Sequence, residues 1–156
     1  EKIQEKVYWK ITHQTGKSDK NRLDNFYSEL DLEVVVLAFI KDIGKAYKEA
    51  DLVISRAGAM TISELIAMEK PSILLPLPWA TDNHQFLNAS FLKEAGSAEI
   101  ITSKKENVSK LAALVSSLAR NKERRLSMTN SAKLAFAPNS AKKIFTKINE
   151  SIKDKP

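Results

Sequence analysis

The chain has 156 residues, of which 43% are hydrophobic, and its formal net charge is +6. This length suits one domain with a sizeable core. The absence of cysteine excludes a disulfide framework and a thiolate metal site. The longest apolar runs, 34–40 and 73–80, are far shorter than the ~18–20 residues of a membrane-spanning helix.

Strand and helix patterns alternate along the chain. Short apolar runs predict strands at 7–12, 32–38, 52–55, 73–77 and 98–102. Helix periodicity with start and stop signals predicts helices at 22–29, 42–49, 62–69, 85–94, 107–119, 122–136 and 140–152. The alternation predicts an α/β fold, a Rossmann-like and mostly parallel sheet with helices on both faces, whose ligands bind at the carboxyl ends of the strands.

Residues 55–64, SRAGAMTISE, form the most informative segment. They follow a short strand, Gly58 permits a sharp turn, and Thr61 opens a helix. The unpaired amides of such a helix start favour a phosphate. The alternative is a capping box, in which the side chains of Thr61 and Glu64 each bond to the other's amide. Spacing by itself favours the box.

A second polar group follows the strand at 73–77. Residues 82–85, DNHQ, bring four side chains that can hydrogen-bond sugar hydroxyls. Two strand ends therefore present polar groups at one edge of the predicted sheet.

The string from Ala50 to Ile101, beginning ADLVISRAGAMTISE and containing DNHQFLNA, closely resembles the donor-binding domain of the bacterial MurG family. These glycosyltransferases add N-acetylglucosamine to lipid I to make lipid II. HQTGK and FIKDIGKAYKEADLV fit the same family in the same order, so the likeness covers roughly residues 7 to 145. It implies that residues 1–156 are a single UDP-sugar donor-binding domain, the C-terminal half of a two-domain GT-B glycosyltransferase.

The resemblance also implies roles for single residues. Glu64 matches the carboxylate that accepts both ribose hydroxyls of the uridine. The backbone of Ile40 matches the group that reads the uracil edge, and Ile43 the side chain packed on the base. Without the resemblance, both isoleucines would be read as core residues.

Two further sets complete the implied donor site. The diphosphate lies on the turn and helix start formed by Gly58, Ala59, Met60 and Thr61. The N-acetylglucosamine hydroxyls face His84 and Gln85, a pair that could equally be ordinary surface residues.

Asn88 is expected to support the loop, and Arg56 either pairs with phosphate or lies on the sheet edge. His13 ends a strand at the same edge, without an assigned contact.

The family's first strand, its glycine-rich turn and its N-terminal acceptor domain would all precede Glu1. We therefore expect a fragment with a gap in its sheet and an unpaired edge. The catalytic base is expected in the missing domain, so this chain by itself is expected to be inactive. The resemblance implies neither a metal nor a cofactor.

Basic residues cluster at 120–125 and at Lys142, Lys143 and Lys147. They form either solvated helix faces or a contact with an anionic membrane surface. No aromatic residues interleave with them as nucleic-acid binding would require, so nucleic acid is not an expected partner. The resemblance implies a cytoplasmic protein, peripheral on the inner face of the cell membrane, that binds UDP-N-acetylglucosamine and meets lipid I through the missing domain.

Three alternatives stay open at this point. One is the UDP-sugar-binding subunit of a two-chain glycosyltransferase. Another is a UDP-N-acetylglucosamine epimerase-like domain, against which the RAGAMTISE and DNHQFLNA strings argue. The last is a basic nucleic-acid-binding domain, which steep salt dependence of DNA binding would support.

Overall fold

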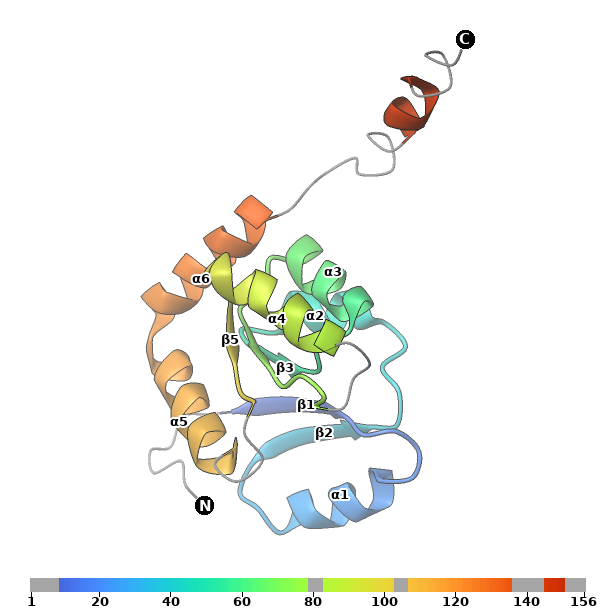
Figure 1. Ribbon diagram of the computed structural model, residues 1–156. Helices are drawn as coiled ribbons and strands as arrows, with labels where there is room; N and C mark the ends of the chain where they lie inside the picture. Colours follow the sequence, from blue (N-terminus) through green and yellow to red (C-terminus); the bar gives the residue numbers. More distant parts are fainter. Residues whose placement is uncertain (1–8, 79–82, 103–106, 136–144, 151–156) are drawn as a thin grey trace.

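The computed structural model describes residues 9–78, 83–102, 107–135 and 145–150 (Figure 1). The strands are β1 (Lys10–Gln14), β2 (Glu33–Leu37), β3 (Val53–Ser55), β4 (Ser72–Leu74) and β5 (Ala98–Ile100). The helices are α1 (Lys20–Ser28), α2 (Ile43–Glu49), α3 (Ala59–Ala67), α4 (His84–Glu94), α5 (Asn107–Arg120) and α6 (Lys122–Ala135). Residues 145–150 are also helical. The predicted alternation of strands and helices is thus confirmed.

Two boundaries differ from the prediction in a way that matters for the site. The first strand runs to Gln14, two residues further than its apolar pattern suggests, because His13 and Gln14, although polar, still pair with β2 through their backbone. Helix α3 begins at Ala59 rather than at 62. Thr61 therefore lies inside its first turn.

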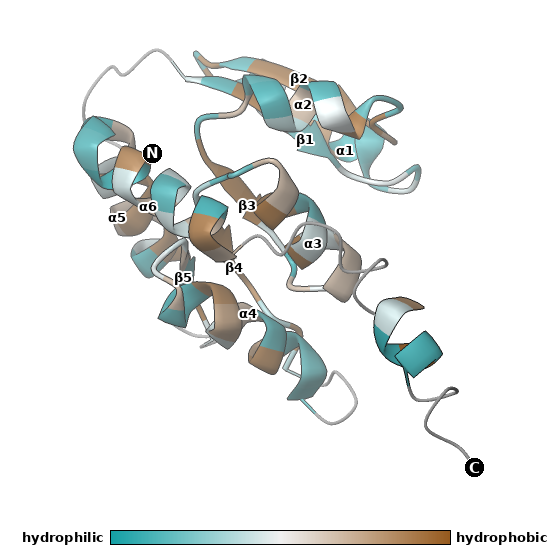
Figure 2. Ribbon diagram, turned by 90° about the horizontal axis from the view of Figure 1, so that it is seen from above, coloured by the Kyte–Doolittle hydropathy of each residue, from teal (hydrophilic) through white to brown (hydrophobic). Residues whose placement is uncertain are grey.

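All strand pairs are parallel, but they form two sheets instead of one. β1 pairs with β2, and β3, β4 and β5 follow one another in the second sheet. Figures 1 and 2 show the two-stranded sheet on one side of β3, with β1 nearer to β3 than β2 is. Among the described residues no pairing joins β1 to β3, and Ile54 of β3 is 47% exposed. A central strand between them stays a prediction.

Helices cover both faces of the three-stranded sheet, as the apolar runs predict. Successive side chains of a strand point to opposite faces, and β4 separates two cores in this way. Leu74 packs in a cluster with residues of α2, α3 and α4, whereas Ile73 packs with Leu118 of α5 and Met128 of α6. Both residues are fully buried. The sheet is therefore a central layer between helices.

The end of α4 is set by a glycine. Gly96 has a φ of +83°, the left-handed conformation that ends helices and that other residues rarely adopt. Its position against α6 is close, because a Cβ there would lie 3.1 Å from the Ser131 Oγ. The predicted stop at Gly96 is confirmed.

Within the described ranges, no helix has the length and apolar character needed to cross a membrane.

We predict that Leu92→Ala lowers the free energy of unfolding by about 2–5 kcal/mol, because it leaves a cavity in the core. Leu92 is 1% exposed, whereas Leu87 on the same helix is 64% exposed. Leu87→Ala makes the same change in helix propensity, and it should cost less than about 0.5 kcal/mol. Urea unfolding of the full-length protein measures both; equal losses would contradict the assigned core.

Candidate functional site

The beginning of α3 is an open helix N-terminus. The amide of Ile62 donates to the carbonyl of Gly58 (3.0 Å), so the amides of Ala59, Met60 and Thr61 precede the first helical bond. Gly58 is the N-cap and has no side chain that could accept from them. These amides and the helix dipole together favour an anion at this turn.

Neither backbone freedom nor lack of space requires a glycine at position 58. Its φ of −65° and ψ of 150° suit any residue, so the turn that Gly58 permits does not depend on a glycine. The nearest atom to a Cβ built there is Thr61 Oγ1 at 4.0 Å, so a side chain has room. What the glycine does is leave the N-cap position without a side-chain acceptor for the three amides.

The capping-box alternative is wrong. Thr61 is the third residue of α3 and cannot serve as its N-cap, and no side chain of the N-cap position bonds to this turn. Glu64 is a turn further along, where its carboxylate bonds to another helix instead. The Tyr47 hydroxyl of α2 donates to Glu64 Oε2 at 3.0 Å.

Tyr47 is buried beside this carboxylate, with 7% of its surface exposed. Burial raises the pKa of the Tyr47 hydroxyl well above its ordinary value near 10, and the hydrogen bond to Glu64 and the charge of Glu64 raise it further. The hydroxyl therefore stays protonated and acts as a donor. Because an ionised carboxylate has about four acceptor positions, Glu64 retains Oε1 and part of Oε2 for other donors.

The predicted base-binding residues follow β2. The amide of Ile40 donates to Gln14 Oε1 at 2.8 Å, which ties this loop to the end of β1. Ile43 is the first residue of α2, and Asp42 caps that helix by accepting from the Lys45 amide (2.9 Å). Ile43 is 39% exposed and Ile40 is half-buried. A fully buried core role for either isoleucine is therefore wrong.

The predicted sugar-binding pair opens α4. His84 is its first residue and is exposed, and Asn83 before it has a φ of 53°. Gln85 Oε1 accepts from the Leu77 amide (3.1 Å), which fixes the helix start to the segment after β4. The other end of the Gln85 amide group carries two donors. Asp82 lies outside the described residues.

Two side chains brace the turn before α3. Asn88 Nδ2 donates to the Ala57 carbonyl at 3.0 Å, so its predicted role in supporting this loop is confirmed. Arg56 Nη1 donates to the Leu75 carbonyl (3.0 Å), which favours the sheet-edge alternative for Arg56. His13 Nδ1 bonds to the Tyr27 hydroxyl of α1 at 3.0 Å.

Known proteins share the sequence pattern and the fold of this chain. The family described as "Glycosyltransferase family 28 C-terminal domain" matches residues 1–144. The chain belongs to this family. The MurG crystal structure from Acinetobacter baumannii superposes with a TM-score of 0.87 at 33% identity, covering 96% of this chain and 45% of that one. The resemblance in sequence and the GT-B-type fold of the domain are therefore confirmed.

Curated relatives are named as UDP-N-acetylglucosamine–N-acetylmuramyl-(pentapeptide) pyrophosphoryl-undecaprenol N-acetylglucosamine transferases. The one from Myxococcus xanthus is 42% identical over 134 residues, which are 86% of this chain and 35% of the relative. The one from Thermodesulfovibrio yellowstonii is 42% identical over 142 residues, which are 91% of this chain and 38% of the relative. The chain thus spans little more than a third of the length of these relatives.

In this family 28 domain, the predicted site residues lie where strands β2, β3 and β4 end. Sequence reasoning missed Gln14 and Tyr47. Tyr47 lies four residues after Ile43 on α2, and this spacing places both side chains on one helix face. That spacing was the sequence signal that Tyr47 lies near the predicted base-binding residue. No sequence signal pointed to Gln14, because its contact with Ile40 spans 26 residues of sequence.

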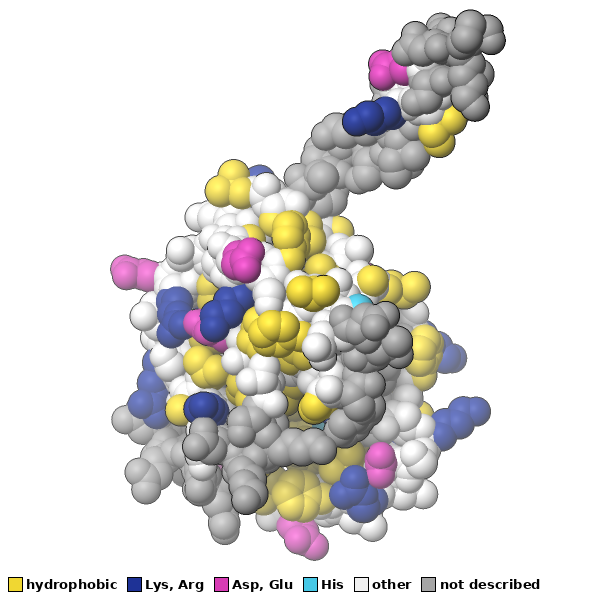
Figure 3. Space-filling view, viewed as in Figure 1, with side chains coloured by type: hydrophobic (Ala, Val, Ile, Leu, Met, Phe, Trp, Pro, Cys, Tyr) yellow, Lys and Arg dark blue, Asp and Glu magenta, His cyan; other side chains and the backbone are white. Residues whose placement is uncertain are grey.

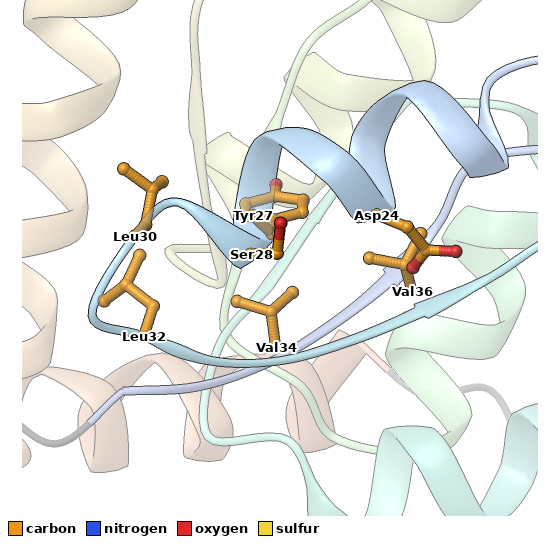
Figure 4. Close-up of a pocket in the computed structure, with 7 residues that line it drawn as sticks. All are labelled: Asp24, Tyr27, Ser28, Leu30, Leu32, Val34 and Val36. Atoms are coloured by element: carbon orange, nitrogen blue, oxygen red, sulfur yellow. The ribbon is translucent and has the colours of Figure 1, made fainter.

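A hollow of the surface lies away from the predicted site residues. It has a volume of about 290 Å³ and is lined by residues of α1 and β2, among them Asp24, Tyr27 and Val36 (Figure 4). None of the predicted donor-site residues lines it. Within the described residues, no cluster of three or more potential metal ligands is present.

Part of the basic cluster at 120–125 has a structural role. Arg124 pairs with Glu99 of β5, and Arg125 Nη1 donates to the carbonyls of Leu118 and Ala119 at the end of α5 (both 2.6 Å). Figure 3 shows basic side chains near the α5–α6 junction with an acidic side chain among them. Lys142 and Lys143 lie outside the described residues.

We predict that Tyr47 makes stability fall as the pH rises above about 10. The unfolded chain loses this proton near pH 10, while the folded chain keeps it because the pKa is raised. The folded state then binds one more proton, so the free energy of unfolding falls by up to about 1.4 kcal/mol per pH unit. Melting temperatures from pH 8.5 upward should fall less steeply in Tyr47→Phe; identical slopes would contradict the prediction.

Proposed function

We propose that this protein is the donor-binding part of an inverting glycosyltransferase that transfers N-acetylglucosamine from UDP-N-acetylglucosamine to lipid I, forming lipid II in peptidoglycan synthesis. The observation that carries the proposal is the uncapped start of α3 beside a half-buried Glu64 that is held from a second helix. The names of the relatives support the choice of donor and acceptor.

Glu64 binds the ribose in this proposal. Two adjacent hydroxyls need two acceptor positions, and a carboxylate with one donor already in place still offers them. Hydrogen bonds to a charged acceptor are about twice as strong as neutral ones. Because Glu64 does not form a capping box with Thr61, its carboxylate is not used to cap its own helix.

The diphosphate lies against the turn from Gly58 to Thr61. Its charge meets the amides of Ala59, Met60 and Thr61, which the uncovered glycine leaves accessible. When the sugar bond breaks, negative charge grows on the departing UDP, and fixed amide dipoles stabilise it without reorganisation. The base that activates the acceptor hydroxyl comes from an acceptor-binding domain, so the present chain is inactive without one.

The two ends of the donor complete the site. Uracil lies beside Ile43 and bonds to the backbone of Ile40. The Ile40 carbonyl can accept from the base, whereas the Ile40 amide can donate to it only if Gln14 Oε1 leaves that amide. The N-acetylglucosamine hydroxyls meet His84 and the amide donors of Gln85, whose oxygen is already bonded to the Leu77 amide.

We also propose a cytoplasmic location, peripheral on the inner face of the cell membrane, with anionic lipid as a partner and no nucleic acid. A net charge of +6 supports attraction to acidic lipids. Because Arg124 and Arg125 are engaged within the fold, exposed lysines such as Lys122 and Lys133 supply this attraction.

The test of the donor class is calorimetric titration of the full-length protein with UDP and with ADP. UDP should bind and ADP should bind far more weakly. Glu64→Gln keeps the size and an acceptor for Tyr47 but removes the charge, and it should weaken UDP by about 1.5–3 kcal/mol, roughly 10- to 150-fold.

Glu94→Gln is the matched control, because Glu94 is an exposed carboxylate at the opposite end of α4. It should leave the affinity for UDP unchanged. Equal binding of UDP and ADP, or an unchanged affinity in Glu64→Gln, would remove the proposed donor site.

A second prediction separates stability from binding at position 58. Gly58→Ser supplies a hydroxyl that caps the free amides, so it should raise the free energy of unfolding by a few tenths of a kcal/mol. The backbone already has the extended N-cap conformation, and a Cβ has room there. The same hydroxyl competes with the diphosphate, so UDP should bind more weakly than in the wild type. Thermal melting measures the stability and titration measures the affinity for UDP. If Gly58→Ser raised both the stability and the affinity, the proposed contact between the diphosphate and this turn would be wrong.

A further inference from the structure

We propose that Tyr47 is a positioning residue of the donor site: its hydroxyl holds one oxygen of Glu64 so that the other faces the ribose hydroxyls. The inference rests on the proposed function and assigns a role to a residue outside the predicted site. The role proposed for Tyr47 is to help the site bind the ribose hydroxyls, not to raise its affinity for every nucleotide.

The anchor is rigid. Tyr47 is 7% exposed and belongs to the core cluster that also contains Ile62 and Leu65, the two buried residues of α3 on either side of Glu64. A ring packed in this way cannot follow the carboxylate if it turns. The 3.0 Å bond therefore fixes Glu64 relative to the core, not to another mobile surface group.

The Tyr47 hydroxyl can donate only one hydrogen bond. Because Tyr47 remains protonated, it occupies one acceptor position on Oε2 and leaves Oε1 open. A free glutamate side chain loses rotamer freedom when it binds a ligand, and this loss weakens binding. Tyr47 imposes the loss during folding, so the ribose meets an acceptor that is already oriented.

The bond also connects two parts of the site. Tyr47 and Ile43 are four residues apart on α2, and residues at this spacing share one helix face. Ile43 is the proposed wall of the base pocket, and Glu64 on α3 is the proposed ribose acceptor. The contact between α2 and α3 thus sets the distance between the base and the ribose positions.

The direct test is Tyr47→Phe in the full-length protein, which keeps the buried ring and removes only the hydroxyl. UDP should bind about three- to tenfold more weakly, the effect of losing one supporting hydrogen bond. 2′,3′-Dideoxy-UDP lacks both ribose hydroxyls, so its affinity should be equal in the two proteins. A merely structural role would not separate the two ligands.

Tyr27→Phe is the matched control. Its hydroxyl is also part-buried and bonded, but to His13, at 3.0 Å. This variant should bind both ligands like the wild type. In the double variant Tyr47→Phe/Glu64→Gln, the loss of UDP affinity should be smaller than the sum of the two single losses, because the two residues are in contact and act together.

The outcomes separate this inference from the proposed function. If the wild type does not distinguish UDP from ADP, the proposed function fails and the ribose role falls with it. If Glu64→Gln weakens UDP but Tyr47→Phe does not, the positioning role is wrong by itself. Equal weakening of UDP and dideoxy-UDP in Tyr47→Phe would also overturn it.

A measurement without ligand tests the contact itself. Carbon NMR of labelled tyrosine follows the ionisation of Tyr47 with pH. Glu64→Gln removes the carboxylate charge that raises the Tyr47 pKa, so Tyr47 should ionise at lower pH in this variant. Ionisation at the same pH in both proteins, with circular dichroism showing that both are still folded, would contradict the bond between Tyr47 and Glu64, and the proposal would fail.

Discussion

Parallel strand pairing is the constraint on which the site depends. Within each sheet the paired strands run the same way, so β3 and β4 end at one edge of their sheet, and β2 ends beside β1 in the other. The segments that follow β2, β3 and β4 begin α2, α3 and α4, and the bond from Tyr47 to Glu64 joins α2 to α3. Each helix start brings its own polar groups to the end of the strand before it. Side chains bonded to backbone, such as Asn88 to Ala57 and Gln85 to Leu77, fix these segments relative to one another.

At the open start of α3, helix capping and the proposed diphosphate contact compete for the same groups. A serine or aspartate at position 58 would cap the helix, and the backbone there already suits one. The glycine instead gives the three amides no side-chain acceptor at the N-cap. A ligand can then supply the acceptor, which is consistent with a family whose relatives are named for a nucleotide-sugar substrate.

Charge patterns required the structure for their interpretation. The cluster at 120–125 reads as a single basic surface in sequence, but Arg124 neutralises Glu99 and Arg125 satisfies carbonyls at the end of α5. Cations at a helix C-terminus are favourable because they oppose its dipole. The net charge therefore overstates the number of basic groups available to a partner.

The sequence by itself determined the α/β class and the order of strands and helices, because hydrophobic periodicity and turn residues are local signals. It predicted which segments line the candidate site. It also carried the likeness to the family that the comparisons confirm. Only the tertiary structure decided whether the Glu64 side chain caps its own helix or bonds to another one. A capping box needs only the local spacing of Thr61 and Glu64. The bond from Tyr47 to Glu64 spans 17 residues and forms only when α2 packs beside α3. The tertiary structure likewise decided that Gln14 meets Ile40, since contacts between distant segments depend on how strands pair, which a local pattern does not encode.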